Sequence, residues 1–196
     1  MASAVSTRHA SPVVATPPVP RSRESLRVTV VPCSLGLALV ACSEAGVRAL
    51  LLGDDAQALR DDLARRFPRA ELLEGDASDA VVRAALCVLE SPQDVSSRTL
   101  PLDPAGTVFQ RRVWEALRRI PPGRTATYTD IAQQLGAPTA SRAVAQACAA
   151  NPLAVLVPCH RVIRQDGTLA GYRWGVERKQ TLLDRERGDP ASAGPR

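Results

Sequence analysis

Residues 158–161, Pro-Cys-His-Arg, combine the side chains best suited to covalent chemistry in this sequence. A thiol beside an imidazole and a guanidinium is a candidate low-pKa nucleophile, because positive neighbours favour the thiolate. The competing interpretation is a buried structural cysteine next to an ordinary core histidine. Residues 155–157 predict a buried strand, whose successive side chains point to opposite faces. We therefore expect His160 to act on Cys159 across a turn or through a water, without direct contact.

A carboxylate that could orient His160 lies in the helix expected over residues 176–186. On the helical wheel, Glu186 falls between Leu182 and Leu183, within the apolar stripe. A carboxylate at such a position is costly unless it is paired. The sequence thus predicts that Glu186 is the partner of His160, in the order carboxylate, imidazole, thiol. The alternative is a frayed last turn with Glu186 in water.

A helix–turn–helix pattern precedes the cysteine. Thr129 is expected to cap a helix over 130–135, Gly136–Pro138 forms a turn, and a second helix covers 141–150. DNA-binding proteins use this arrangement, as do many other helical hairpins. The second helix is rich in alanine, so it is slim enough for the narrow minor groove, with Arg142 as its one strong charge. Alternatively, it packs on another helix and leaves Arg142 solvated.

The rest of the chain must position these groups. Three short strands between residues 26 and 52 predict an antiparallel meander, and helices are expected over 56–67, 79–89 and 107–120. The first half is thus a small α+β unit without a catalytic constellation, and the second is mainly helical. The expected organisation is a disordered tail (1–25), an α+β domain (26–92), a linker (93–105), a site-bearing domain (106–188) and a second disordered tail (189–196).

Composition limits the possible partners. Residues 1–100 contain 11 basic and 12 acidic side chains, whereas residues 101–196 contain 14 basic and 8 acidic ones. The second half therefore suits a polyanionic partner. The five cysteines lack CxxC spacing, which argues against a disulfide framework and for reduced thiols in the cytoplasm. The most apolar stretch, 35–52, is interrupted by charges, so we expect no membrane span.

Several motifs in order resemble one family. Val157–Val162 resembles the acceptor-site motif of the O6-alkylguanine-DNA alkyltransferases, also called methylated-DNA–protein-cysteine methyltransferases. Asn151 stands at the family's spacing before the cysteine. Further matching stretches are Gly106–Gln110, Val113–Trp114, Ala126–Tyr128, Ser141–Val144 and Gly171–Gly175. The resemblance is strong over 101–187 and fainter over 26–100, and it is greatest to the C-terminal half of the bacterial adaptive-response proteins.

The resemblance implies an α+β protein. Its first domain would be ribonuclease-H-like, and its second would be a mainly helical, winged-helix-like or helix-turn-helix domain that binds DNA and carries the active site. It also implies a monomer that binds double-stranded DNA in the minor groove and flips out O6-alkylguanine, or O4-alkylthymine. The alkyl group would pass to Cys159 in a single-turnover reaction without a cofactor.

The resemblance also implies a role for each matched residue. Cys159 accepts the alkyl group, His160 takes its proton through a water, Glu186 orients the imidazole and Asn151 supports the site. Tyr128 lies against the DNA backbone and can protonate the departing guanine, and Arg142 fills the vacated place in the base stack. The backbone at Cys159, Val162 and Arg173 reads the guanine edges, and Tyr172 forms a wall of the pocket. The remaining DNA-contacting positions are Thr129, Ala140, Ser141 and Ala143.

Three departures from the family pattern have consequences. The only histidines are His9 and His160, so we predict no zinc site of the kind that some relatives carry in the first domain. A cysteine-rich sensing domain is missing, which argues against a transcriptional role. Arg173 replaces a smaller serine, so its side chain is expected to narrow the pocket or touch a phosphate, and benzyl adducts would react poorly.

Three rival functions make different predictions. A module that only recognises alkylated bases would lack the acceptor cysteine. A Cys-His hydrolase would turn over an ester or amide without DNA. A transcription regulator would bind a defined undamaged operator.

Overall fold

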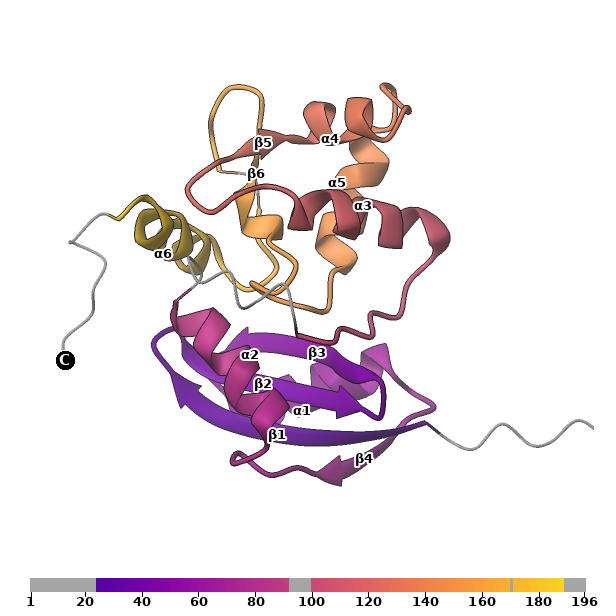
Figure 1. The fold of residues 1–196 in the computed structure, drawn as a ribbon, viewed down its shortest axis with the longest axis vertical. Helices are drawn as coiled ribbons and strands as arrows, with labels where there is room; N and C mark the ends of the chain where they lie inside the picture. Colours follow the sequence, from indigo (N-terminus) through magenta and orange to yellow (C-terminus); the bar gives the residue numbers. More distant parts are fainter. Residues whose placement is uncertain (1–23, 92–99, 170, 189–196) are drawn as a thin grey trace, which may run out of the picture.

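The computed structural model describes residues 24–91, 100–169 and 171–188 of the 196-residue chain (Figure 1). The first half contains a four-stranded sheet in the order β3-β2-β1-β4. Its strands are β1 (Ser25–Cys33), β2 (Gly36–Ser43), β3 (Gly46–Gly53) and β4 (Glu71–Glu74). The predicted antiparallel meander is confirmed for β1 to β3. The sequence reading missed β4, which pairs parallel with β1, because its largely exposed residues lack an alternating pattern.

Two helices pack on this sheet, α1 (Ala56–Arg66) and α2 (Ala80–Glu90), close to the predicted ranges. An aspartate caps the N-terminus of each helix. Asp55 and Asp79 accept hydrogen bonds from backbone N–H groups of the first turn, which would otherwise lack partners. Residues 38–41 of β2 are all buried. Since successive side chains point to opposite faces, both faces of the sheet are covered.

The second half is mainly helical, as predicted, and lies above the sheet in Figure 1. Its helices are α3 (Val108–Arg118), α4 (Tyr128–Gln134), α5 (Ser141–Ala150) and α6 (Val176–Arg187). Short parallel strands β5 (Ala126–Thr127) and β6 (Val162–Ile163) add a small second sheet. The expected cap of α4, Thr129, is wrong. Thr127 is the cap, because it forms a reciprocal pair of hydrogen bonds with Asp130.

The predicted strand over 155–157 is also wrong. These residues form a buried turn, and Val155 has a positive φ of 64°. The turn closes on itself, because Val157 N–H donates to the Leu153 carbonyl at 3.0 Å. A short apolar run identifies burial without distinguishing a strand from another buried conformation. The turn leads into a 3₁₀ helix, η2 (Cys159–Arg161), which carries the cysteine.

The two halves are joined by backbone hydrogen bonds along β3. Leu50 N–H donates to the Pro152 carbonyl, and Ala154 N–H donates back to the Leu50 carbonyl, both at 2.9 Å. Val47 pairs in the same way with Pro101 and Asp103, at the end of the predicted linker. Residues 93–99 of that linker, the preceding Pro92 and both predicted tails, apart from Glu24 and Ser25, lie outside the described residues. Among the described helices, none has the length and apolar character needed to cross a bilayer.

Candidate active site

The sulfur of Cys159 is buried and accepts a hydrogen bond from the side-chain amide of Asn151. Cys159 is 5% exposed, and its Sγ accepts a hydrogen bond from Asn151 Nδ2 at 3.2 Å. Asn151 is fully buried at the end of α5. Its Oδ1 accepts from Leu153 N–H at 2.9 Å, while its Nδ2 also donates to the carbonyls of Leu153 and Val157. These contacts fix the amide so that nitrogen, not oxygen, faces the sulfur.

His160 and Glu186 meet in the interior. His160 Nε2 lies 2.7 Å from Glu186 Oε1, and neither side chain has exposed surface. Burial opposes ionisation of Glu186, yet hydrogen bonds from His160 and Arg161 outweigh it and lower its pKa to about 2. Burial also lowers the pKa of His160, which favours the neutral imidazole. With Nε2 donating to the carboxylate, Nδ1 is left as a basic nitrogen without a hydrogen-bond partner among the described residues.

Arg161 does not face the thiol, contrary to the sequence expectation. Its Nε donates to both carboxylate oxygens of Glu186 at 3.0 and 2.9 Å, and a terminal nitrogen donates to the Ile120 carbonyl at 2.6 Å. Gly123 N–H adds a further hydrogen bond to Glu186 at 3.1 Å. The guanidinium thus neutralises the buried carboxylate, because the 3₁₀ turn of η2 directs Arg161 toward α6.

The cation that acts on the sulfur is Lys179, which the sequence reading missed. It is 1% exposed, its Nζ donates to the Val162 carbonyl at 2.6 Å, and its charge lowers the pKa of Cys159. The signal was available: Lys179 lies three and four residues before Leu182 and Leu183, so it shares their buried face of α6.

The thiol is not a low-pKa group in this state. Burial raises the pKa of Cys159 to about 11, and the Asn151 hydrogen bond and the Lys179 charge offset only part of that effect. The expectation of a resting thiolate is therefore wrong, because it took account of neighbouring charges and neglected desolvation. The neutral thiol must lose its proton as part of any reaction.

Two tyrosines lie near the sulfur. Tyr128 begins α4 and is half-buried; burial, followed by the charges of Cys148 and Cys159, raises its pKa to about 12. Tyr172 packs edge-on against His160, with ring centroids 6.5 Å apart, and against Trp174 at 5.1 Å. Its buried hydroxyl has no hydrogen-bond partner among the described residues. Both phenols are neutral near pH 7 and can donate a proton or a hydrogen bond.

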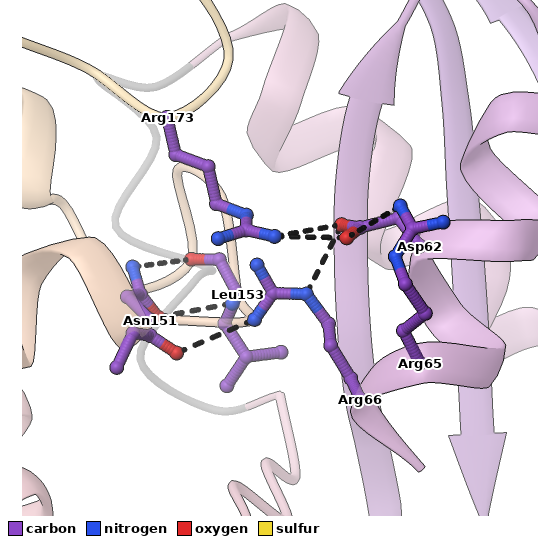
Figure 2. A network of polar contacts seen from close by, with 7 residues as sticks. Asp62, Arg65, Arg66, Asn151, Leu153 and Arg173 are labelled. Atoms are coloured by element: carbon purple, nitrogen blue, oxygen red, sulfur yellow. Dashed lines mark hydrogen bonds and ion pairs between the residues drawn. The ribbon is translucent and has the colours of Figure 1, made fainter. Parts of the chain in front are cut away.

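The side chain of Arg173 forms an ion pair with Asp62 of α1 at 2.8 Å (Figure 2). The expected narrowing of the pocket and the expected contact with a phosphate stay predictions. The backbone of Val162, expected to read a base edge, is already engaged: its N–H donates to the Cys159 carbonyl, and its own carbonyl accepts from Lys179. A carbonyl can still accept a second hydrogen bond.

Helix α5 has two different faces. Its inner face packs on α3, where Trp114 Nε1 donates to the Ala147 carbonyl at 2.9 Å. Arg142 is exposed in its first turn and makes no hydrogen bond or ion pair to the described residues. The structure therefore bears out the alternative interpretation, a helix packed on another helix with Arg142 in solvent, and minor-groove binding by α5 stays a prediction. The other expected DNA-contacting positions, Thr129, Ala140, Ser141 and Ala143, are partly exposed.

Comparison with known proteins identifies the class. Residues 108–188 match the family model described as 6-O-methylguanine DNA methyltransferase, DNA binding domain. The crystal structure of Mycobacterium tuberculosis OGT in complex with DNA superposes with a TM-score of 0.66 at 32% identity, covering 86% of this chain and 96% of that one. The fold and the matched segment thus place the chain in the structural class of the O6-methylguanine methyltransferases.

Full-length relatives place the chain more narrowly. The methylated-DNA–protein-cysteine methyltransferase of Lodderomyces elongisporus is 38% identical over 161 residues, which are 70% of this chain and 80% of that protein. The Escherichia coli bifunctional transcriptional activator/DNA repair enzyme Ada is 50% identical over 163 residues, and the chain spans only 46% of its length. This chain belongs to the methylated-DNA–protein-cysteine methyltransferase family.

Proposed function

We propose that the protein repairs double-stranded DNA by moving the alkyl group of O6-alkylguanine, and of O4-alkylthymine, to the sulfur of Cys159. The observation that carries the proposal is a single arrangement. The Cys159 thiol is held by the Asn151 amide, and the adjacent His160 imidazole is anchored on a buried carboxylate. Family membership supports the same activity, since relatives are named for methyl transfer from DNA to a protein cysteine.

His160 is the base in the proposed reaction. The Cys159 proton moves to the partnerless Nδ1 through a water, and the resulting imidazolium is stabilised by Glu186. Asn151 and Lys179 stabilise the thiolate as it forms. Since the resting pKa of the thiol is about 11, deprotonation is coupled to substrate binding and does not precede it. Such acid–base assistance contributes about 10²- to 10⁴-fold to a rate.

The sulfur then attacks the alkyl carbon, so that an S–C bond forms as the carbon–O6 bond breaks. The electron pair passes to the guanine ring, and the neutral phenol of Tyr128 supplies a proton. The proton held by His160 then passes to Tyr128 and restores its phenol, so that the net proton transfer is from the thiol to the guanine. The product is a thioether, which the acid–base groups of this site do not cleave, and each molecule reacts once.

The base must leave the duplex to reach a buried sulfur. Flipping costs a few kcal/mol, and less for a poorly paired damaged base. Arg142 is the group proposed to enter the vacated place, because it is exposed on the slim helix α5. Insertion from the minor groove suits the partly exposed alanines around it, which permit close approach. In this proposal Tyr172 forms one wall of the pocket for the flipped base, and the backbone at Arg173 hydrogen-bonds to the edge of that base.

Mass spectrometry tests this function directly. After incubation with a duplex that contains O6-methylguanine, the peptide carrying Cys159 is expected to gain the mass of one CH₂ unit. Cys159→Ala should bind the duplex and gain nothing. Mass on a different peptide, or none with the native chain, would refute the assignment.

Three finer statements accompany the proposal as predictions. The first half is ribonuclease-H-like and the second winged-helix-like, the protein acts as a monomer, and it works in the cytoplasm. Similar structures at 32% and 26% identity support an α+β alkyltransferase fold at the coarser level.

A further inference from the structure

Helix α1 belongs to the half of the protein that contributes no reacting group, yet its last turns contact both sides of the cysteine site. Asp62 accepts hydrogen bonds from Arg173 at 2.8 and 3.1 Å and from Arg66 Nε at 3.1 Å (Figure 2). Arg66 in turn directs its Nη1 at the Ala150 carbonyl, at the long distance of 3.5 Å. Arg65 also reaches Asp62, at 3.4 Å. Of the three guanidinium groups on this carboxylate, those of Arg66 and Arg173 reach different segments of the second half.

The first of these segments includes Tyr172, whose ring packs against His160. It is tied to α1 at two points. Arg173 pairs with Asp62, and Arg178 joins the Trp174 carbonyl to Asp54, just before the start of α1. Between these two ties lies a groove of about 520 Å³ lined by α1 and by Arg173 and Trp174. The ion pairs thus hold the segment to α1 on either side of the groove, next to the buried Trp174.

The second segment contains Asn151, which follows Ala150. Its amide is aligned by Leu153, and Leu153 lies between the two backbone hydrogen bonds to Leu50 of β3. The sheet edge and the Arg66 contact therefore approach Asn151 from the first half of the chain. Asn151 Nδ2 donates to the sulfur, and this hydrogen bond lowers the pKa of Cys159.

We propose that Asp62 and Arg66 are positioning residues for the alkyl-transfer site. Asp62 fixes the segment that includes Tyr172 through Arg173. Arg66 fixes the end of α5, next to which Asn151 donates to the sulfur. This inference rests on the proposed function. It assigns to the first half a part in the chemistry, although that half holds neither the acceptor nor the proposed DNA-binding helix.

Single-turnover kinetics with a duplex containing methyl-labelled O6-methylguanine test it. We expect Asp62→Asn and Arg66→Gln each to lower the saturating rate by about tenfold, because small displacements of reacting groups have large effects. Affinity for the undamaged duplex should stay within about twofold, since neither residue lies on the proposed DNA face. The pH at which the transfer rate rises should also be higher for Arg66→Gln than for the native protein, because a displaced Asn151 stabilises the thiolate less.

Matched controls come from the same helix. Among the described residues, Asp61 accepts a hydrogen bond from Gln57 on the exposed side. The Arg65 side chain is 70% exposed, reaches Asp62 only at 3.4 Å and contacts no segment of the second half in the part that the structure describes. Asp61→Asn and Arg65→Gln should therefore react at close to the native rate. The double variant of Asp62→Asn and Arg173→Gln should lose no more than Asp62→Asn alone, as expected for one shared interaction.

The outcomes separate the two proposals. If the native chain and both controls transfer methyl and the Asp62 and Arg66 variants match them in rate and pH profile, the positioning role is wrong and the function stands. Loss of rate in direct proportion to loss of folded protein, measured by thermal unfolding, also overturns the role. If the native chain transfers no methyl group, the function fails and the inference with it.

Discussion

The amide nitrogen of Asn151 and the sulfur of Cys159 lie 3.2 Å apart, so the residue that caps the C-terminus of α5 holds the group that we propose accepts the alkyl chain. The helix proposed to contact DNA and the acceptor are thereby joined by one hydrogen bond. A disturbance of α5 reaches the sulfur without an intermediate element.

Asn151→Asp tests this hydrogen bond with little change of shape. The carboxylate can still accept from Leu153 N–H, but it places negative charge beside the sulfur and removes the donor. We expect the pKa of Cys159 to rise further and methyl transfer to free O6-methylguanine to slow by about 10²-fold. Gln180→Glu, an exposed position on α6, adds the same charge and should react normally. Equal rates for both variants would remove Asn151 from the mechanism.

Glu186→Gln removes the buried carboxylate that His160 and Arg161 share. Near neutral pH the variant should be less stable by on the order of 3 kcal/mol, because Arg161 is left buried without its counter-charge. The pKa of Glu186, about 2, is below the ordinary 4.5, so the stability it contributes is present above pH 4.5 and is lost as pH falls toward 2. Denaturant unfolding of both proteins should therefore show a difference that shrinks across this range. A constant difference would contradict the ionised pair.

The same substitution should slow transfer, since the imidazolium formed on His160 loses its partner. We expect the rate of Glu186→Gln to rise at higher pH than that of the native protein, measured below the unfolding temperature of the variant. An unchanged pH–rate profile would count against the proposed relay from thiol to imidazole.

Lys179→Met replaces the buried cation with an apolar side chain of similar length. Its removal takes away the positive charge that lowers the pKa of Cys159 and the donor to the Val162 carbonyl. Transfer should slow by about tenfold or more, with the pH dependence moved upward. Arg187→Met removes an exposed charge from the same helix and serves as the control. If the two variants react alike, the charge on Lys179 has no role in forming the thiolate.

Arg142→Ala should separate base flipping from chemistry. The exposed guanidinium touches no group of the cysteine site, so reaction with free O6-methylguanine should be unchanged, whereas repair of duplex DNA should slow by about tenfold or more. Arg111→Ala, also exposed, controls for the loss of one positive charge. Equal loss on duplex and free base would show that Arg142 supports the site itself and does not replace the flipped nucleotide.

The sequence predicted the helices and the meander because their periodicity and caps are local features. It also placed Glu186 on the buried face of α6, and the structure puts that carboxylate against His160. The properties that it mistook depend on three-dimensional surroundings. Residue type says that Arg161 is positive, but the turn of η2 decides that it faces Glu186. The pKa of Cys159 depends on how completely the sulfur is buried, which no motif specifies.

Contacts between distant parts of the chain were the least accessible. Asp62 and Arg173 are 111 residues apart, and each looks like an ordinary surface charge on its own element. The parallel strand β4 has too few buried residues to show a pattern. Local sequence patterns do not predict such pairings, because the stabilising backbone and charge partners are supplied by distant segments of the chain.

The hydrogen bonds between Leu50 and residues 152–154 bear on how the protein can be dissected. The family match begins at Val108, so a fragment cut there would contain every proposed reacting group and yet lack the strand that completes the turn below the sulfur. Such a fragment would expose unpaired backbone groups and an apolar edge, which favour self-association. The segment that matches the family model is thus shorter than the shortest fragment that we expect to be active.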